Sequence, residues 1–186
     1  MEHFEKELEW IEDEGVRKMT QDVIKWIPDW FWHEAASSTG KYHPSYAQGE
    51  GGLYRHTVAA LKIAHCLLEL EFMQQKFDAI ERSYIMAAIM LHDCCKRGYK
   101  DIPSKYTLFE HPMVVYDWLM HLKECDIVDE HYVCTVSDLV SSHMGQWNTS
   151  KYSQIVLPKP ESELQQFVHM CDYLASKKFL EVNFDD

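Results

Sequence analysis

The run from Ile85 to Leu91 contains only apolar side chains and leads directly into His92 and Asp93. This stretch follows a helical pattern, so the two polar residues stand at the end of an apolar helix. An imidazole and a carboxylate are costly to desolvate unless a partner compensates them, and a divalent cation does this well. A buried hydrogen bond between the two side chains would satisfy the same groups. The pair therefore indicates either a metal site or a structural His–Asp bond.

Another histidine and another aspartate lie far from this pair in the sequence. Gly51 and Gly52 lead into a long helical pattern that has His56 in its first turn. Asp172 interrupts a helical stretch with an apolar core face. That face consists of Phe167, Val168, Cys171 and Leu174. With His92 and Asp93, these two residues make a set of four candidate ligands.

Two further histidines stand at expected helix ends. His111 precedes Pro112, and since proline disfavours helix in its predecessor and fits the first helical turn, His111 is expected at a helix start. His143 follows the apolar pattern of 130 to 142, just before Gly145 breaks it. Both positions suit the rim of a cavity. His65 and His169 share helices with proposed ligands, and we leave both out of the site.

The order of these residues resembles the HD superfamily of metal-dependent phosphohydrolases, whose signature is H, then HD, then D on separate helices. The resemblance covers about Ser37 to Lys178 and implies an all-α bundle. It also implies a metal site made of six residues, because members with two metals add one histidine after the HD helix and one before the final aspartate. The matching positions are His56, His92, Asp93, His111, His143 and Asp172.

A finer likeness is to the HD domain of certain 3′-to-5′ exoribonucleases. It rests on Tyr42-His43, on Gly51-Gly52-Leu53, on the turn His143-Met144-Gly145 and on the stretch 172–177. Those enzymes carry an additional nucleic-acid-binding OB domain, for which 186 residues leave no room. The chain also resembles compact stand-alone HD proteins, including viral ones, for which nucleotide hydrolysis is a common assignment.

Hydrophobic periodicity predicts an all-α, single-domain bundle. No linker divides the chain, and its length suits one domain. We expect N-terminal helices in 1–36 that pack on an HD domain in 37–180. The helical patterns cover 4–14, 16–33 with a break or kink at Pro28, 53–76, 79–95, 112–124, 130–142 and 161–178, with loops at 37–52, 97–110 and 144–160.

The net charge of −12 argues against a long nucleic acid as partner, because such binding relies on many neutralised phosphates. A local exception is the cationic stretch that follows the HD pair, with Lys96, Arg97, Lys100 and Lys105 against one acid. Such a rim would attract a small phosphorylated substrate. The candidate substrate-binding residues are Lys41, His43, Lys96, Arg97 and Trp147, the last as a stacking surface for a base.

The resemblance implies that His56, His92, Asp93 and Asp172 hold one divalent cation, while Asp93 bridges to a second held by His111 and His143. Mixed His/carboxylate ligation fits manganese, iron, cobalt, nickel or zinc, with magnesium also admitted. Hydroxide attack at such a centre would hydrolyse a phosphate ester, with Asp93 and Lys96 as catalytic residues.

Three functions stay open at this point. The leading one is hydrolysis of a nucleotide or a related small phosphate ester. The second is a phosphodiesterase or 3′-to-5′ exonuclease acting on short oligonucleotides or cyclic dinucleotides. The third is a non-catalytic nucleotide-binding module.

Six scattered cysteines without a C-x-x-C pair are expected to be reduced core thiols. The acidic start is unlike a secretory signal, and apolar runs are too short to cross a bilayer. We therefore expect an intracellular protein without a membrane partner, with a virus-infected host cell as one setting. The oligomeric state is open.

Overall fold

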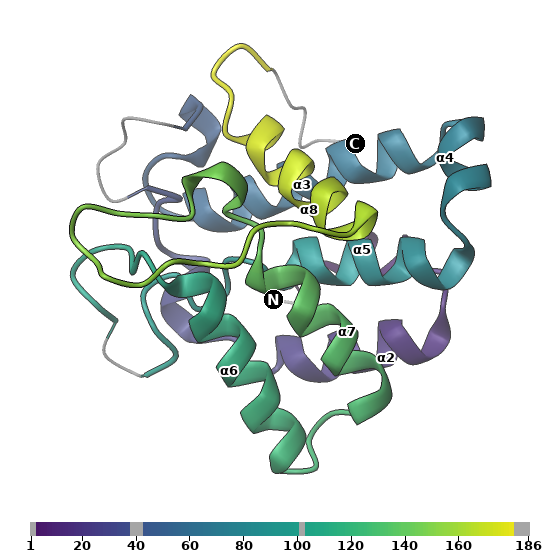
Figure 1. Cartoon of the computed structure of the whole chain (residues 1–186), viewed down its shortest axis with the longest axis horizontal. Coiled ribbons are helices and arrows are strands. Elements are labelled where there is room, and N and C mark those ends of the chain that lie inside the picture. The colour runs from purple at the N-terminus through teal and green to yellow at the C-terminus, as the bar shows by residue number, and fades with distance from the viewer. Residues whose placement is uncertain (1–2, 38–42, 101–102, 181–186) are drawn as a thin grey trace.

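The computed structural model describes residues 3–37, 43–100 and 103–180. Within these ranges the regular structure is helical, apart from an isolated bridge between Lys96 and Gly98. Figure 1 shows the helices packed around α5. The elements are α1 (Glu5–Glu9), α2 (Glu14–Ile24), η1 (Asp29–Trp32), η2 (Ser45–Ala47), α3 (Gly52–Leu68), α4 (Glu71–Lys76), α5 (Ala79–Leu91), α6 (His111–Glu124), α7 (Glu130–Ser141), η3 (Gly145–Trp147) and α8 (Glu163–Ala175). The predicted all-α fold is confirmed.

The helix α5 is the centre of the bundle. Every residue from Ser83 to Leu91 is buried, and α5 contacts α2, α3, α7 and α8. A capping box fixes its start. The Asp78 side chain accepts a hydrogen bond from Glu81 N, and the Glu81 side chain accepts one from Asp78 N. Because α5 is surrounded by helices, the residues at its C-terminal end emerge into the interior of the protein.

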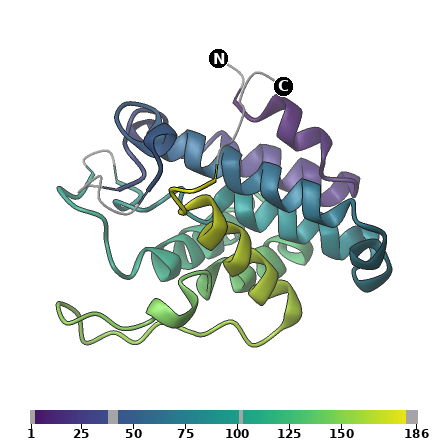
Figure 2. The same ribbon diagram turned by 90° about the horizontal axis from the view of Figure 1, so that it is seen from above.

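The helices α3, α6, α7 and α8 form, with α2, the rest of the bundle around α5. Seen from above in Figure 2, α8 crosses α3 and α5, while α6 and α7 pack against one another. A second capping box, made by Ser162 and Gln165, starts α8. Pro112 lies in the first turn of α6, as predicted. Helices α3, α7 and α8 thus pack directly on α5, and α6 packs on α7.

Two predicted helices differ clearly from the structure, and a third, predicted for 79–95, ends earlier, at Leu91. The predicted helix 53–76 is divided into α3 and α4, because Leu70 has an extended backbone with φ −70° and ψ 133°. The predicted helix 4–14 is only the short α1, which ends at Glu9. In the second segment the helix stops at Ile24, ahead of Pro28, so the expected break occurs.

The N-terminal segment packs on the rest of the chain. Phe4 is buried against Phe31 and Tyr54, and α2 contacts both α5 and α7. Division of the chain into 1–36 and 37–180 therefore does not separate two cores. Among the helices of the described ranges, none is long and apolar enough to cross a membrane.

Candidate metal centre

Five segments deliver the six predicted ligands to one place. His56 lies in the second turn of α3, His92 and Asp93 follow α5, and His111 is the first residue of α6. His143 follows α7, and Asp172 belongs to α8. All except Asp172 are almost fully buried, and the Asp172 side chain is 22% exposed. Asp172 is therefore the most accessible of the six predicted ligands.

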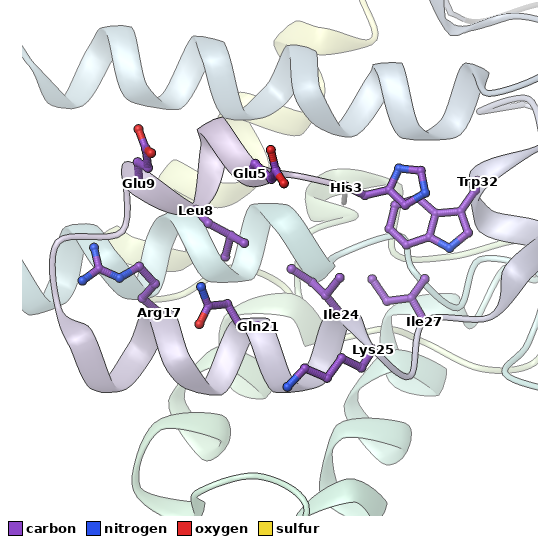
Figure 3. A pocket seen from close by; sticks show the side chains of 10 residues that line it. All are labelled: His3, Glu5, Leu8, Glu9, Arg17, Gln21, Ile24, Lys25, Ile27 and Trp32. Carbon is purple, nitrogen blue, oxygen red and sulfur yellow. The ribbon is translucent and has the colours of Figure 1, made fainter. Parts of the chain in front are cut away.

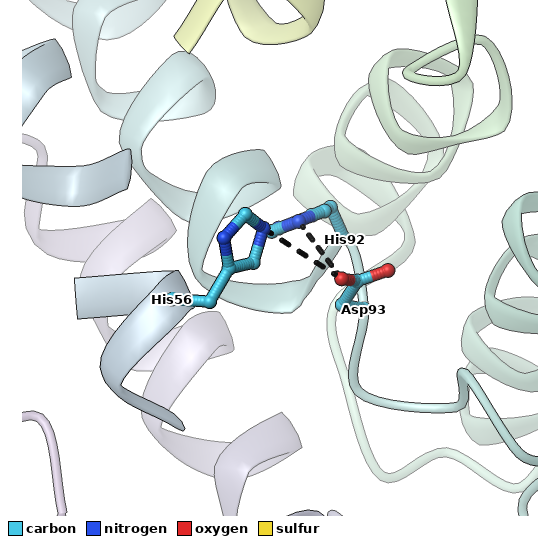
Figure 4. Close-up of side chains that lie close together, drawn as sticks. All are labelled: His56, His92 and Asp93. Carbon is cyan, nitrogen blue, oxygen red and sulfur yellow. Dashed lines mark ion pairs between the residues drawn. The ribbon is translucent and has the colours of Figure 1, made fainter. Parts of the chain in front are cut away.

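A first group consists of His56, His92 and Asp93, drawn in Figure 4. Asp93 Oδ2 lies 3.9 Å from His56 Nε2 and 3.4 Å from His92 Nε2. Asp172 joins them, since its Oδ1 lies 2.9 Å from His56 Nε2 and 3.5 Å from His92 Nε2. Two carboxylates and two imidazoles thus converge as the sequence predicts.

A second group consists of Asp93, His111 and His143. It uses the other carboxylate oxygen, because Asp93 Oδ1 lies 3.1 Å from His111 Nε2 and 3.8 Å from His143 Nε2. The two Nε2 atoms lie 3.0 Å apart. Asp93 therefore stands between the two groups, with one oxygen facing each.

Backbone carbonyls fix the orientation of three of the imidazoles. Nδ1 of His92, His111 and His143 donates to the carbonyl oxygen three residues earlier, at 2.7, 2.7 and 2.8 Å. A carbonyl only accepts, so Nδ1 carries a proton and Nε2 is the ring nitrogen that faces the centre, where it can ligate a cation once it is unprotonated. This is how histidines are held for metal ligation.

The charges of the centre favour a bound cation. Burial disfavours their ionised forms, yet the neighbouring Lys96 and His92 hold the pKa of Asp93 well below its ordinary value, and His56 and His92 do the same for the pKa of Asp172. Burial likewise opposes a charged His92, but Asp93 and Asp172 outweigh it and raise the pKa of His92 to about 10. Two ionised acids therefore draw positive charge into the centre.

Unsatisfied atoms show that a metal fits. His92 Nε2 and Asp93 Oδ1, which face the ligand groups, are buried without a hydrogen-bond partner among the described residues. The facing Nε2 atoms of His111 and His143 also repel one another unless one ring takes a second proton or a cation lies between the ligand atoms. Burial and the charges of His111 and His92 lower the pKa of His143 to about 3, so His143 is neutral. A cation removes both penalties.

Lys96 lies at the edge of the first group. Its Nζ is 2.5 Å from Asp93 Oδ2, and its side chain is 12% exposed. The hydrogen bond from Lys96 N to Asp93 O closes the turn that brings the two side chains together. The ammonium group of Lys96 thus contacts the carboxylate that both groups share.

Of the other predicted substrate contacts, His43 lies beside a predicted ligand, Arg97 is paired within the chain, and Lys41 is not described. The His43 ring meets the His56 ring edge-on at 4.9 Å, and burial followed by repulsion from His56 and Lys96 lowers the pKa of His43 to about 3. Arg97 is bound to Glu34 and to the carbonyl of Ser104, so its guanidinium has partners within the chain. Lys41 lies outside the described residues.

Trp147 lies in η3, four residues after His143. Its ring is 45% exposed and stacks on Tyr173 at 5.3 Å and 16°. Lys177 Nζ lies 3.5 Å from the centre of the Tyr173 ring and 5.8 Å from that of Trp147. Because Tyr173 is next to Asp172, this aromatic pair adjoins the helix that supplies a ligand.

Sequence reasoning missed His169. Its Nδ1 donates to the carbonyl oxygen of His143 at 2.7 Å. The signal that was available is its offset of three residues from Asp172, which puts both on one face of α8. His65, the other histidine that shares a helix with a predicted ligand, stacks on Trp10 at 4.4 Å.

A surface cavity of about 840 Å³ shares no residue with this centre. Figure 3 shows it between α1 and α2, where the side chains of His3, Trp32 and Ile24 line it together with both acids and bases. Its mixed charges and its place apart from the ligands give it no part in the centre.

Comparison with known proteins identifies the class: the chain is a metal-dependent phosphohydrolase. It belongs to the HD domain family, which matches residues 53–177. The dihydroneopterin 2′,3′-cyclic phosphate phosphodiesterase of Methanocaldococcus jannaschii is a relative, 28% identical over 187 residues that cover 95% of this chain and 69% of the relative. No solved structure matches the chain. The superfamily inferred from the sequence is therefore confirmed.

Proposed function

We propose that the chain hydrolyses a small phosphate diester or monoester that carries a planar heterocycle, with the six-residue centre as its active site. The observation that carries this proposal is the sharing of Asp93 between two ligand groups, one on each carboxylate oxygen. A shared carboxylate is the arrangement expected of a two-cation phosphohydrolase.

In this proposal His56, His92, Asp93 and Asp172 bind one divalent cation. Asp93, His111 and His143 bind a second. Manganese, iron, cobalt, nickel and zinc suit the mixed nitrogen and oxygen ligands, and magnesium is included in the set to be tested. The bound cations supply an acidified water and neutralise negative charge on the phosphoryl oxygens.

The other groups orient and neutralise the phosphate. Lys96 is the proposed catalytic cation. Its ammonium group is paired with Asp93, and it also donates a hydrogen bond to a phosphoryl oxygen of the bound substrate at the edge of the centre. His43 is neutral at physiological pH, and its buried Nδ1 has no partner among the described residues. It therefore has a free hydrogen-bonding group for a substrate oxygen. Arg97 and Lys41 remain predicted substrate contacts.

The heterocycle of the substrate is assigned to Trp147. The exposed indole of Trp147 stacks on Tyr173, the neighbour of Asp172, and offers a flat surface on which a base or a pterin can stack. The relative named above acts on a cyclic phosphate of dihydroneopterin, which supports a diester bond and a planar ring in the substrate of this chain. A short oligonucleotide end presents the same two features and is the second candidate.

A substrate panel tests the proposal. Purified protein should be assayed with nucleotides, 2′,3′-cyclic and 3′,5′-cyclic phosphates, dinucleotides and short oligomers, each with manganese, cobalt, nickel, zinc, iron and magnesium. Release of product from at least one small ester is expected. Release of mononucleotides from oligomers alone would favour the exonuclease, and tight binding without turnover across all metals would favour the non-catalytic module.

The His143→Ala substitution should remove about half of the bound metal, because one of the two groups loses a ligand. Elemental analysis of protein loaded with manganese measures this directly. The His121→Ala variant is the control, since His121 is an exposed histidine on α6. Unchanged stoichiometry in His143→Ala would exclude the second cation.

The Trp147→Ala substitution should raise KM about tenfold while kcat changes little, because stacking contributes about 1–3 kcal/mol to base binding. Steady-state kinetics on the best substrate of the panel separate the two constants. Trp26→Ala is the control, because Trp26 is also exposed but follows α2. An unchanged KM in Trp147→Ala would leave the heterocycle without its proposed site.

An intracellular location and the absence of a long nucleic-acid partner stay predictions of the sequence, as does the finer likeness to exoribonuclease domains and viral proteins.

A further inference from the structure

His143 is the one histidine of the second group that lies beyond the end of its helix. The helix α7 ends at Ser141 and has Ser142 as its C-cap. The His143 ring donates to Val140 O, which fixes the ring relative to the helix. His143 N also donates to Val140 O, at 3.2 Å, but the carbonyl of His143 lies beyond the end of α7. A carbonyl at a helix end needs a donor from outside the helix.

His169 provides that donor from another helix. Its Nδ1 lies 2.7 Å from the carbonyl oxygen of His143. Since a carbonyl accepts, Nδ1 of His169 carries the proton. His169 is one turn before Asp172 on α8, so the helix that contributes a ligand to the first group also holds the backbone of a ligand in the second.

Gly145 makes this contact possible. Its φ is +58°, a conformation that favours glycine, and a Cβ there would lie 2.2 Å from His169 Cε1 and 2.3 Å from His169 Nε2. The His169 ring therefore lies directly against the backbone of the turn. Trp147 and Tyr173 pack beside the ring, with centroid distances of 5.9 and 6.3 Å.

We infer that His169 is a positioning residue for the second group: through its hydrogen bond to the His143 carbonyl it sets where His143 Nε2 points. The inference rests on the role proposed above for His143 as a ligand. Loss of an outer partner of a metal ligand weakens metal binding about 10–100-fold. His169 itself does not touch the metal or the substrate.

The test compares three variants for metal content and affinity. His169→Ala removes the donor, whereas His169→Asn keeps an N–H group close to the position of Nδ1. His121→Ala removes an exposed histidine from α6. We expect manganese affinity of the second group to fall about 10–100-fold in His169→Ala, to fall much less in His169→Asn, and to be unchanged in the control. The first group should retain its cation throughout.

Full metal content and affinity in His169→Ala would overturn the inference. Equal losses in His169→Ala and His169→Asn would also overturn it, because the hydrogen bond would then be irrelevant. Urea unfolding of the metal-free variants separates this effect from a loss of stability, which would weaken both groups alike. If His143→Ala itself keeps both cations, it is the proposed function that fails, which distinguishes the two failures.

Gly145→Ala provides an independent route to the same contact. The added methyl group must displace the His169 ring, so the second group should weaken although both histidines are present. If the two residues act through one contact, the losses of affinity in Gly145→Ala and His169→Ala will be less than additive in the double variant. Additive losses would count against a shared contact.

Discussion

Replacing Asp93 with alanine should lower kcat by at least about 10³-fold, which corresponds to about 4 kcal/mol of transition-state stabilisation. The reason is the position of Asp93 between the two groups, with Oδ2 facing His56 and His92 and Oδ1 facing His111. No other residue of the described chain belongs to both groups. Its removal therefore affects every proposed cation at once.

The chain should still fold without Asp93. Its side chain bonds to Lys96, and Lys96 is partly exposed, so that ammonium group can turn toward water when the carboxylate is gone. Circular dichroism and urea unfolding check this. Asp117→Ala is the matched control, because Asp117 is an exposed acid on α6. Turnover retained by folded Asp93→Ala would rule out Asp93 as the shared ligand.

Gly52→Ala should destabilise the protein by about 3 kcal/mol, at the upper end of the usual cost of overpacking. A Cβ at Gly52 would lie 2.4 Å from Ala47 O, 2.6 Å from Ala47 C and 3.2 Å from Ala35 Cα. These are backbone atoms, and Ala47 O already accepts a hydrogen bond from Ala36 N. The loop cannot move aside without losing that bond. The free energy of unfolding in urea measures the effect.

Gly49→Ala is the control in the same loop. Gly49 has a φ of +67° but nothing within 4 Å of its Cβ position, so the substitution should cost only the backbone strain of about 1–2 kcal/mol. Equal losses for the two variants would show that crowding at Gly52 does not matter. Activity should also fall in Gly52→Ala, since the same contact positions the start of α3, which carries His56.

Helical periodicity was sufficient for the fold because apolar faces determine which side of each helix is buried. It predicted α5, α6, α7 and α8 to within a few residues, apart from the end of α5, where the turn with His92 and Asp93 replaces helix. The division at Leu70 escaped it, since no glycine or proline marks the point and the apolar pattern continues across it.

The six ligands could be predicted only from the residue types and their order along the chain. Spacing in the sequence does not reveal which helix ends meet in the fold. The same limit explains Arg97, whose partner Glu34 lies 63 positions earlier, 97−34, and is invisible to local patterns. It also explains His169, whose bond to the His143 carbonyl and packing against the Gly145 turn join segments that are separate in the sequence.

The helix α8 is the last helix of the described chain, and it packs across α3 and α5 to complete the centre. Because α8 brings Asp172 to the first group and binds the His143 carbonyl of the second group through His169, one helix contributes to both groups. We therefore expect cation binding and the docking of α8 to stabilise one another.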